Sequence, residues 1–140
     1  MTFPRFHLAF PVTDLEQAKE FYTKILGCKT GRESKNWIDF DFYGHQIVAH
    51  YSADIPDCPT SLVAGRQVPI RHFGLLLGRG DWQKLADSLA KKGVEFLIPP
   101  HIRFVGQPGE QATMFIQDPA GNGLEFKSFA TNEAIFATGI

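Results

Sequence analysis

The stretch Asp118-Pro119-Ala120-Gly121-Asn122-Gly123-Leu124-Glu125-Phe126-Lys127, near the C-terminus, decides how this chain folds. Its first half is rich in Pro, Gly and Asn, which predicts a turn, and its second half alternates apolar and polar residues, which predicts a strand. Because side chains alternate between the two faces of a strand, Leu124 and Phe126 share one face and Glu125 lies on the other. A carboxylate is rarely buried without a partner, so Glu125 is a candidate functional residue.

Two histidines occupy comparable places earlier in the chain. His7 lies in the run Arg5-Phe6-His7-Leu8-Ala9-Phe10, and His72 lies in Arg71-His72-Phe73-Gly74-Leu75-Leu76-Leu77. Each histidine holds an early position in a run that is typical of a buried strand. We expect His7, His72 and Glu125 to meet in space around one metal ion.

The first half of the sequence predicts a β-α-β-β-β unit. A strand over residues 3–12 is followed by a helix that opens with Thr13-Asp14-Leu15-Glu16, a capping-box pattern with Thr13 as the N-cap. Gly27 is expected to end the helix, and Tyr43-Gly44 to form a tight turn. Three further strands are expected near residues 28–33, 36–42 and 45–52.

The second half repeats this order after a linker. Residues 54–70 hold several prolines with little periodicity, so they are expected to connect the two halves. The elements predicted beyond them are a strand at 71–78, a helix from Asp81 to Lys92, and strands at 94–98, 111–117 and 122–129. An inserted loop, Pro99 to Gln111, is expected to close over a cavity, and residues 130–140 form a C-terminal tail.

Landmarks at nearly constant spacing indicate an internal duplication. The matching pairs are His7 and His72, Asp14 and Asp81, and Gly27 and Gly93. We therefore predict one α+β domain built from two tandem β-α-β-β-β modules, about 3–53 and 71–129. Their curved mixed sheets carry a helix on each outer face, and their inner faces surround a metal-binding cavity lined by His7, Gln46, His50, His72 and Glu125.

Composition excludes several classes of partner. The chain has 140 residues, is 44% hydrophobic, and carries a net charge of −1. Neither nucleic acid nor an anionic membrane surface is therefore an expected partner, and no apolar run approaches the roughly 20 residues that span a bilayer. With no signal-peptide pattern and with Cys28 and Cys58 outside any disulfide framework, a cytoplasmic protein is expected.

The motifs resemble those of the vicinal oxygen chelate superfamily. This superfamily includes glyoxalase I, bleomycin-resistance proteins, fosfomycin-resistance thiol transferases and extradiol dioxygenases. The resemblance runs from Phe6 to Phe129 and rests on residues 6–15, 21–27 and 118–126. Residues 42–50 and 100–104 resemble a small bacterial group of predicted extradiol-type dioxygenases.

The resemblance implies a metal site. Superfamily ligands come from the first strand of each module and the last strand of the second, positions held here by His7, His72 and Glu125. Two imidazoles and a carboxylate leave coordination positions open, and Fe²⁺ is favoured, with Mn²⁺, Zn²⁺ or Ni²⁺ as alternatives. Glyoxalase-like members add a carboxylate from the last strand of the first module, where residues 44–51 offer none. His50 is therefore a candidate fourth ligand or acid/base.

Further candidates surround this predicted centre. His101 is a second candidate acid/base, while Arg103, Phe115, Thr113 and Gln46 are candidates for binding substrate. The planar guanidinium of Arg103 suits a substrate carboxylate, although a solvated loop charge explains it equally well.

The leading hypothesis is an Fe²⁺ extradiol-type dioxygenase acting on a small catechol-like or enolisable substrate. The alternatives are a glyoxalase-type lyase or fosfomycin-resistance-type thiol transferase, in which the metal is a Lewis acid, and a metal-free drug-binding module of the bleomycin-resistance type. A homodimer is expected, because each module leaves a sheet edge that needs a partner. Whether each site lies within one chain or across two is left open.

Overall fold

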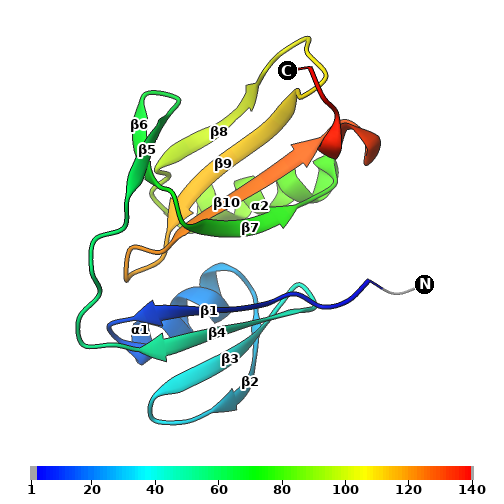
Figure 1. Cartoon of the computed structure of the whole chain (residues 1–140). Coiled ribbons are helices and arrows are strands. Elements are labelled where there is room, and N and C mark those ends of the chain that lie inside the picture. The colour runs from blue at the N-terminus through cyan, green and yellow to red at the C-terminus, as the bar shows by residue number, and fades with distance from the viewer. Residues whose placement is uncertain (1–2, 140) are drawn as a thin grey trace. The chain divides into compact units, whose positions relative to one another are not determined.

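A computed structural model describes residues 3–139, and the chain divides into two compact units. The first unit extends to Asp57 and also contains the turn Asp118–Asn122, while the second contains Cys58–Gln117 and the residues from Gly123 onward. Each unit has one four-stranded mixed sheet with a longer helical segment against it (Figure 1). The predicted α+β fold is therefore confirmed.

The first unit has the predicted β-α-β-β-β order. Its sheet has the strand order β1-β4-β3-β2, in which β1 pairs with β4 in parallel and the other pairs are antiparallel. The elements are β1 (His7–Val12), α1 (Leu15–Glu20), the π-helix η1 (Phe21–Ile25), β2 (Lys29–Glu33), β3 (Trp37–Phe42) and β4 (His45–Tyr51).

The second unit repeats this topology behind a small hairpin. Its sheet has the order β7-β10-β9-β8, again with one parallel pair, β7 with β10. The elements are β5 (Thr60–Val63), β6 (Arg66–Pro69), β7 (His72–Leu76), α2 (Arg79–Lys91), β8 (Ile98–Arg103), β9 (Gln111–Gln117), β10 (Gly123–Phe129) and the 3-10 helix η2 (Glu133–Phe136).

The core lies on one face of each sheet. In β1, Phe10 and Val12 are buried while His7 on the other face is exposed, as the alternation predicts. In the second unit, the Trp82 indole of α2 donates to the Phe126 carbonyl of β10 at 2.9 Å, which holds the helix against the sheet. Polar side chains are therefore left for the opposite faces.

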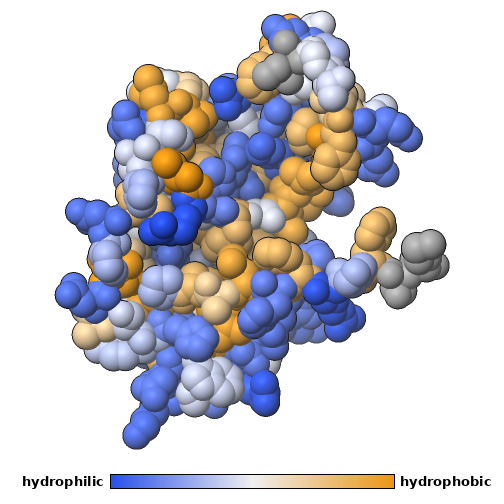
Figure 2. All heavy atoms as spheres, viewed as in Figure 1, coloured by the Kyte–Doolittle hydropathy of each residue, from blue (hydrophilic) through white to orange (hydrophobic). Residues whose placement is uncertain are grey.

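Some local features differ from the prediction. The N-cap of α1 is Asp14 rather than Thr13, because the Asp14 carboxylate accepts a hydrogen bond from the Gln17 backbone N–H at 3.0 Å. The expected linker contains the β5–β6 hairpin, whose turn residues Ala64 and Gly65 have φ angles of 49° and 79°. Figure 2 shows apolar residues over this hairpin, where Leu62 is 68% exposed.

The strand expected at 94–98 is also wrong. It begins at Ile98 and continues to Arg103 through Pro99 and Pro100. The prolines fit because β8 is an edge strand and its register with β9 shifts between Ile98 and His101. The following loop is therefore shorter than predicted, and His101 and Arg103 are strand residues rather than loop residues.

No helix among residues 3–139 is long and apolar enough to cross a membrane.

Candidate metal centre

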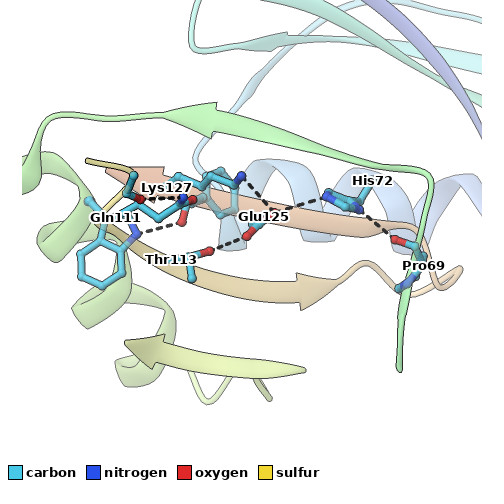
Figure 3. A network of polar contacts seen from close by, with 9 residues as sticks. Pro69, His72, Gln111, Thr113, Glu125 and Lys127 are labelled. Atoms are coloured by element: carbon cyan, nitrogen blue, oxygen red, sulfur yellow. Dashed lines mark hydrogen bonds and ion pairs between the residues drawn. The ribbon is translucent and has the colours of Figure 1, made fainter. Parts of the chain in front are cut away.

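Glu125 lies on the middle strand of a polar cluster in the second unit (Figure 3). Strand β10 has β7 on one side and β9 on the other. The register places Glu125 opposite Gly74 of β7 and Phe115 of β9, and His72 starts β7. The fold thus brings side chains from three strands to one carboxylate.

The two oxygens of Glu125 have different neighbours. Oε2 accepts a hydrogen bond from the Thr113 hydroxyl at 2.5 Å. Oε1 lies 3.3 Å from His72 Nε2 and 3.9 Å from Lys127 Nζ. Because the side chain is only 12% exposed, these contacts act with little screening by water.

The hydrogen bond on the far side of His72 defines its chemistry. His72 Nδ1 lies 2.8 Å from the Pro69 carbonyl oxygen, which can only accept, so Nδ1 carries a proton. In the neutral ring, Nε2 then presents a lone pair to Glu125 Oε1, which is also an acceptor. Two acceptors this close require a proton or a cation between them. An imidazole and a carboxylate so arranged fit a divalent metal, with Pro69 orienting the ring.

Two glycines make this arrangement possible. A Cβ at Gly74 would lie 1.6 Å from the Glu125 carbonyl oxygen, a distance that no side chain tolerates. A Cβ at Gly123 would lie 2.9 Å from the Phe115 ring and 3.1 Å from the His72 Cβ. The Phe115 ring itself packs edge-on against His72, with centroids 4.8 Å apart. The backbone around the cluster is therefore matched to its side chains.

His7 belongs to the first unit and has a similar local setting. Its Nδ1 lies 2.7 Å from Oε1 of Gln46, the residue opposite it in the β1–β4 register. With Nδ1–H donating to that amide oxygen, Nε2 keeps its lone pair for another ligand. Gln46 thus contacts His7, and its predicted role in binding substrate stays a prediction.

His72 and Glu125 are thus in contact, whereas His7 is on the other unit. Across the described chain, no three His, Cys, Asp or Glu side chains form a group suited to a metal. The three-residue centre stays a prediction, and the geometry of the second unit supports two of its members.

In the first unit, Val48 takes the position that Glu125 has in the second. Val48 pairs with Ala9 of β1 as Glu125 pairs with Gly74 of β7. The nearest acid on that face is Asp39, directly opposite Val48 on β3 and in an ion pair with Arg32. His50 is exposed on β4, and its role as fourth ligand or acid/base stays a prediction.

Basic side chains follow the cluster across the second sheet. Lys127 and His101 both lie opposite Thr113, from β10 and β8 respectively, and Arg103 lies opposite Gln111. Residues directly opposite each other share a face, so these side chains flank Glu125. The sequence places Lys127 on the strand face of Glu125, two residues away, but Lys127 is not among the predicted site residues.

His101 carries an unused acceptor. Its Nδ1 lies 2.9 Å from the Pro99 carbonyl oxygen, so Nδ1 holds the proton. Its Nε2 is buried and has no hydrogen-bond partner among residues 3–139. Arg103 stacks its guanidinium over the Phe104 ring at 4.8 Å.

The family model of the Glyoxalase/Bleomycin resistance protein/Dioxygenase superfamily matches residues 6–126. The chain therefore belongs to this superfamily, as its motifs predicted. It is 24% identical over 120 residues to the metallothiol transferase FosB of Lysinibacillus sphaericus (strain C3-41), covering 86% of this chain and 78% of FosB.

Solved structures agree with this assignment. The crystal structure of a glyoxalase/bleomycin resistance protein/dioxygenase from Alicyclobacillus acidocaldarius is 34% identical, with a TM-score of 0.83 and coverage of 95% of this chain and 96% of that one. The fosfomycin resistance protein FosX of Listeria monocytogenes shares the fold at 16% identity, with a TM-score of 0.71 and coverage of 96% and 98%.

Proposed function

We propose that this chain is a divalent-metal enzyme of the transferase or lyase type, with His7, His72 and Glu125 as metal ligands. The observation that carries the proposal is the pair of facing acceptors, His72 Nε2 and Glu125 Oε1, at 3.3 Å. At this distance both atoms can act as ligands of one cation. Without a cation or a proton between them, the two lone pairs would face each other unfavourably. The similarity to a metallothiol transferase favours this chemistry over the dioxygenase hypothesis.

A bound cation would supply Lewis acidity toward a substrate oxygen. For an epoxide substrate, the thiol or water would form a bond to the ring carbon as its C–O bond breaks, and the nucleophile's proton would pass through a base to the released oxygen. The chain's own residues would bind and orient the substrate. Lys127, His101 and Arg103 share the ligand face of the second sheet and favour a substrate with a negatively charged group. Phe115 supplies an apolar wall beside His72.

His101 suits the role of general base in this scheme. Its Nε2 is the basic nitrogen of a ring whose Nδ1–H is already engaged by Pro99. Removal of a thiol or water proton requires a base with a free lone pair, and His101 Nε2 is buried, so this role also requires that substrate binding exposes the nitrogen. His50, on the first unit, is the other candidate.

An extradiol-type dioxygenase is the second candidate. The relative that is 34% identical is described as a glyoxalase/bleomycin resistance protein/dioxygenase, so oxygen chemistry stays within the range of its class. The same three ligands would then hold Fe²⁺. A metal-free drug-binding module is the third candidate, in which a proton on His72 would hold the His72–Glu125 pair together.

An assay panel separates these functions. Protein loaded with Mn²⁺, Zn²⁺, Ni²⁺ or anaerobic Fe²⁺ would be tested for thiol addition to small anionic epoxides such as fosfomycin, for hemithioacetal isomerisation, and for oxygen uptake with catechols. We expect thiol addition or isomerisation with a redox-inert metal and no oxygen uptake. Oxygen uptake that requires Fe²⁺ would instead establish the dioxygenase.

A further inference from the structure

Thr113 has a contact that its predicted role in binding substrate does not explain. Its hydroxyl donates to Glu125 Oε2 at 2.5 Å, from the neighbouring strand β9. Thr113 is 3% exposed, so this hydroxyl has little access to water. An ionised carboxylate has no proton to give, which fixes the direction of the bond from Thr113 to Glu125.

Resting on the metal site proposed above, we propose that Thr113 is a positioning residue that makes Glu125 a one-oxygen ligand. The hydroxyl donates a hydrogen bond to Oε2, while Oε1 faces His72 Nε2. Both contacts are needed to fix the carboxylate, because a side chain held at only one oxygen keeps its freedom to rotate about its last bond.

The different neighbours of the two Glu125 oxygens support this assignment. The neutral hydroxyl lies on Oε2, while the imidazole and the Lys127 ammonium lie on the Oε1 side at 3.3 and 3.9 Å. Oε1 is therefore the oxygen that Thr113 leaves available to a cation, on the side of His72 Nε2, although the Lys127 ammonium would weaken binding there. Hydrogen bonds that orient a metal ligand from behind commonly affect metal affinity by about 10- to 100-fold.

The fold makes Thr113 well suited to this role. On β9 it lies two residues from Phe115, the residue directly opposite Glu125, so it shares the face of Phe115 and its short side chain reaches the carboxylate diagonally. Most of β9 is buried, and in a purely apolar setting valine would serve as well as threonine. The hydroxyl therefore needs a function, and Glu125 Oε2 is the acceptor it has.

Mn²⁺ binding to Thr113→Val and Thr113→Ser tests the proposal. Free Mn²⁺ would be measured by electron paramagnetic resonance during titration, and the absorption spectrum of the Co²⁺-loaded protein would report the ligand field. We expect about 10- to 100-fold weaker Mn²⁺ binding and an altered Co²⁺ spectrum for Thr113→Val. Thr113→Ser keeps the donor and should restore both.

Thr60→Val is the matched control. The Thr60 hydroxyl also donates to a side-chain oxygen, that of Gln67 at 2.9 Å, but in the β5–β6 hairpin. It should leave Mn²⁺ affinity unchanged. If Thr113→Val fails to fold by circular dichroism, Thr113→Ala, which also lacks the hydroxyl, takes its place.

The outcomes distinguish this inference from the proposed function. Wild-type protein that binds no Mn²⁺ would overturn both. Wild-type protein that binds Mn²⁺ while Thr113→Val or Thr113→Ala binds it equally well, with the same Co²⁺ spectrum, would overturn the role of Thr113 and leave the metal site intact. Weak binding by Thr113→Ser as well as Thr113→Val would also contradict it, because the loss would then not depend on the hydroxyl.

Discussion

At the scale of single residues, the hydrogen bond at Nδ1 separates four of the five histidines into two kinds. His7, His72 and His101 each have Nδ1 next to an oxygen acceptor, which leaves Nε2 with a lone pair. In His45 the Phe6 backbone N–H donates to Nδ1 at 3.0 Å, so Nε2 carries the proton. His45 is therefore unsuited to bind metal through Nε2, whereas His7, His72 and His101 each present an Nε2 lone pair to a metal.

Replacement of Lys127 is expected to strengthen metal binding rather than weaken it. Its ammonium lies 3.9 Å from Glu125 Oε1 and would repel a cation bound there. Lys127→Met should therefore bind Mn²⁺ about 3- to 10-fold more tightly than wild type, while turnover of an anionic substrate falls. Titration followed by electron paramagnetic resonance measures the first effect, with Lys84→Met on α2 as the control. Weaker Mn²⁺ binding in Lys127→Met would contradict the assignment of Oε1 to the metal.

The buried pair of Tyr22 and Asp118 in the first unit makes the free energy of unfolding depend on pH. Burial raises the pKa of Asp118 above its ordinary value, while hydrogen bonds from Asn122, Tyr22 and Ala120 lower it in part. The Tyr22 hydroxyl donates to Asp118 Oδ2 at 2.8 Å. With its folded pKa raised, the Asp118 carboxyl contributes stability below its unfolded pKa, and that contribution is lost as pH rises through the folded pKa.

Tyr22→Phe should lower the free energy of unfolding by about 1–3 kcal/mol at pH 7. The hydroxyl favours the ionised form of Asp118, so its loss should cost less as the pH falls below the folded pKa of that carboxyl. Urea unfolding at several pH values measures this, with the exposed Tyr51→Phe as control. A cost that is constant with pH, or that grows in acid, would contradict this account.

At the scale of elements, the parallel pair β7–β10 depends on Gly74. A Cβ there would lie 1.6 Å from the Glu125 carbonyl oxygen, so Gly74→Ala must push the two strands apart. We expect a loss of about 3 kcal/mol or more in the free energy of unfolding, together with weaker metal binding. Gly80→Ala, on α2 with open space around it, should cost nothing. Equal stability of the two variants by thermal melting would show that β7 is not held this closely.

Element order was largely predictable, because both modules place strong turn and helix-end signals between periodic runs. Gly27, Gly93 and Tyr43-Gly44 adopt the positive φ angles that such signals predict. Strand β8 was not predictable from its prolines, since their tolerance depends on its position at the sheet edge, which only the tertiary fold defines. The ion pair of Lys127 with Glu125 was not predictable either, because a shared strand face does not show where the long lysine side chain lies.

At the scale of the whole molecule, we predict a homodimer. Strands β1 and β7 are each at an edge of their sheet, and apolar side chains such as Phe6, Ile70 and Leu76 are exposed, at 60%, 53% and 51%. A second copy would cover such edges and side chains. Light scattering at tens of micromolar should give twice the 15.7 kDa chain mass. A monomeric mass at that concentration would contradict this prediction.

The strands that carry His7, His72 and Glu125 were predictable, because the duplication equates His7 with His72 and the turn at 118–122 precedes the strand of Glu125. Their role as metal ligands rests on the resemblance to the superfamily and stays a prediction. The Glu125 contacts with Thr113 and Lys127 needed the register of β10 against β9. Composition and spacing do not specify a register to one residue. Composition and spacing do not predict the substrate either, since substrate recognition depends on how side chains from several strands converge.

The metal content of the purified protein tests the central claim, that His7, His72 and Glu125 hold a divalent metal. Wild type and Glu125→Gln would be loaded with Mn²⁺ or anaerobic Fe²⁺, desalted, measured by elemental analysis, and melted with and without chelator. The isosteric amide should preserve the fold, because Leu124 and Phe126 provide the packing on the other strand face and both are fully buried.

We expect about one ion per chain in wild type and a melting temperature that falls by several degrees on adding chelator. Glu125→Gln should hold little metal and barely respond to chelator. No metal in loaded wild-type protein, or an equal metal content and chelator response in both proteins, would contradict the metal centre.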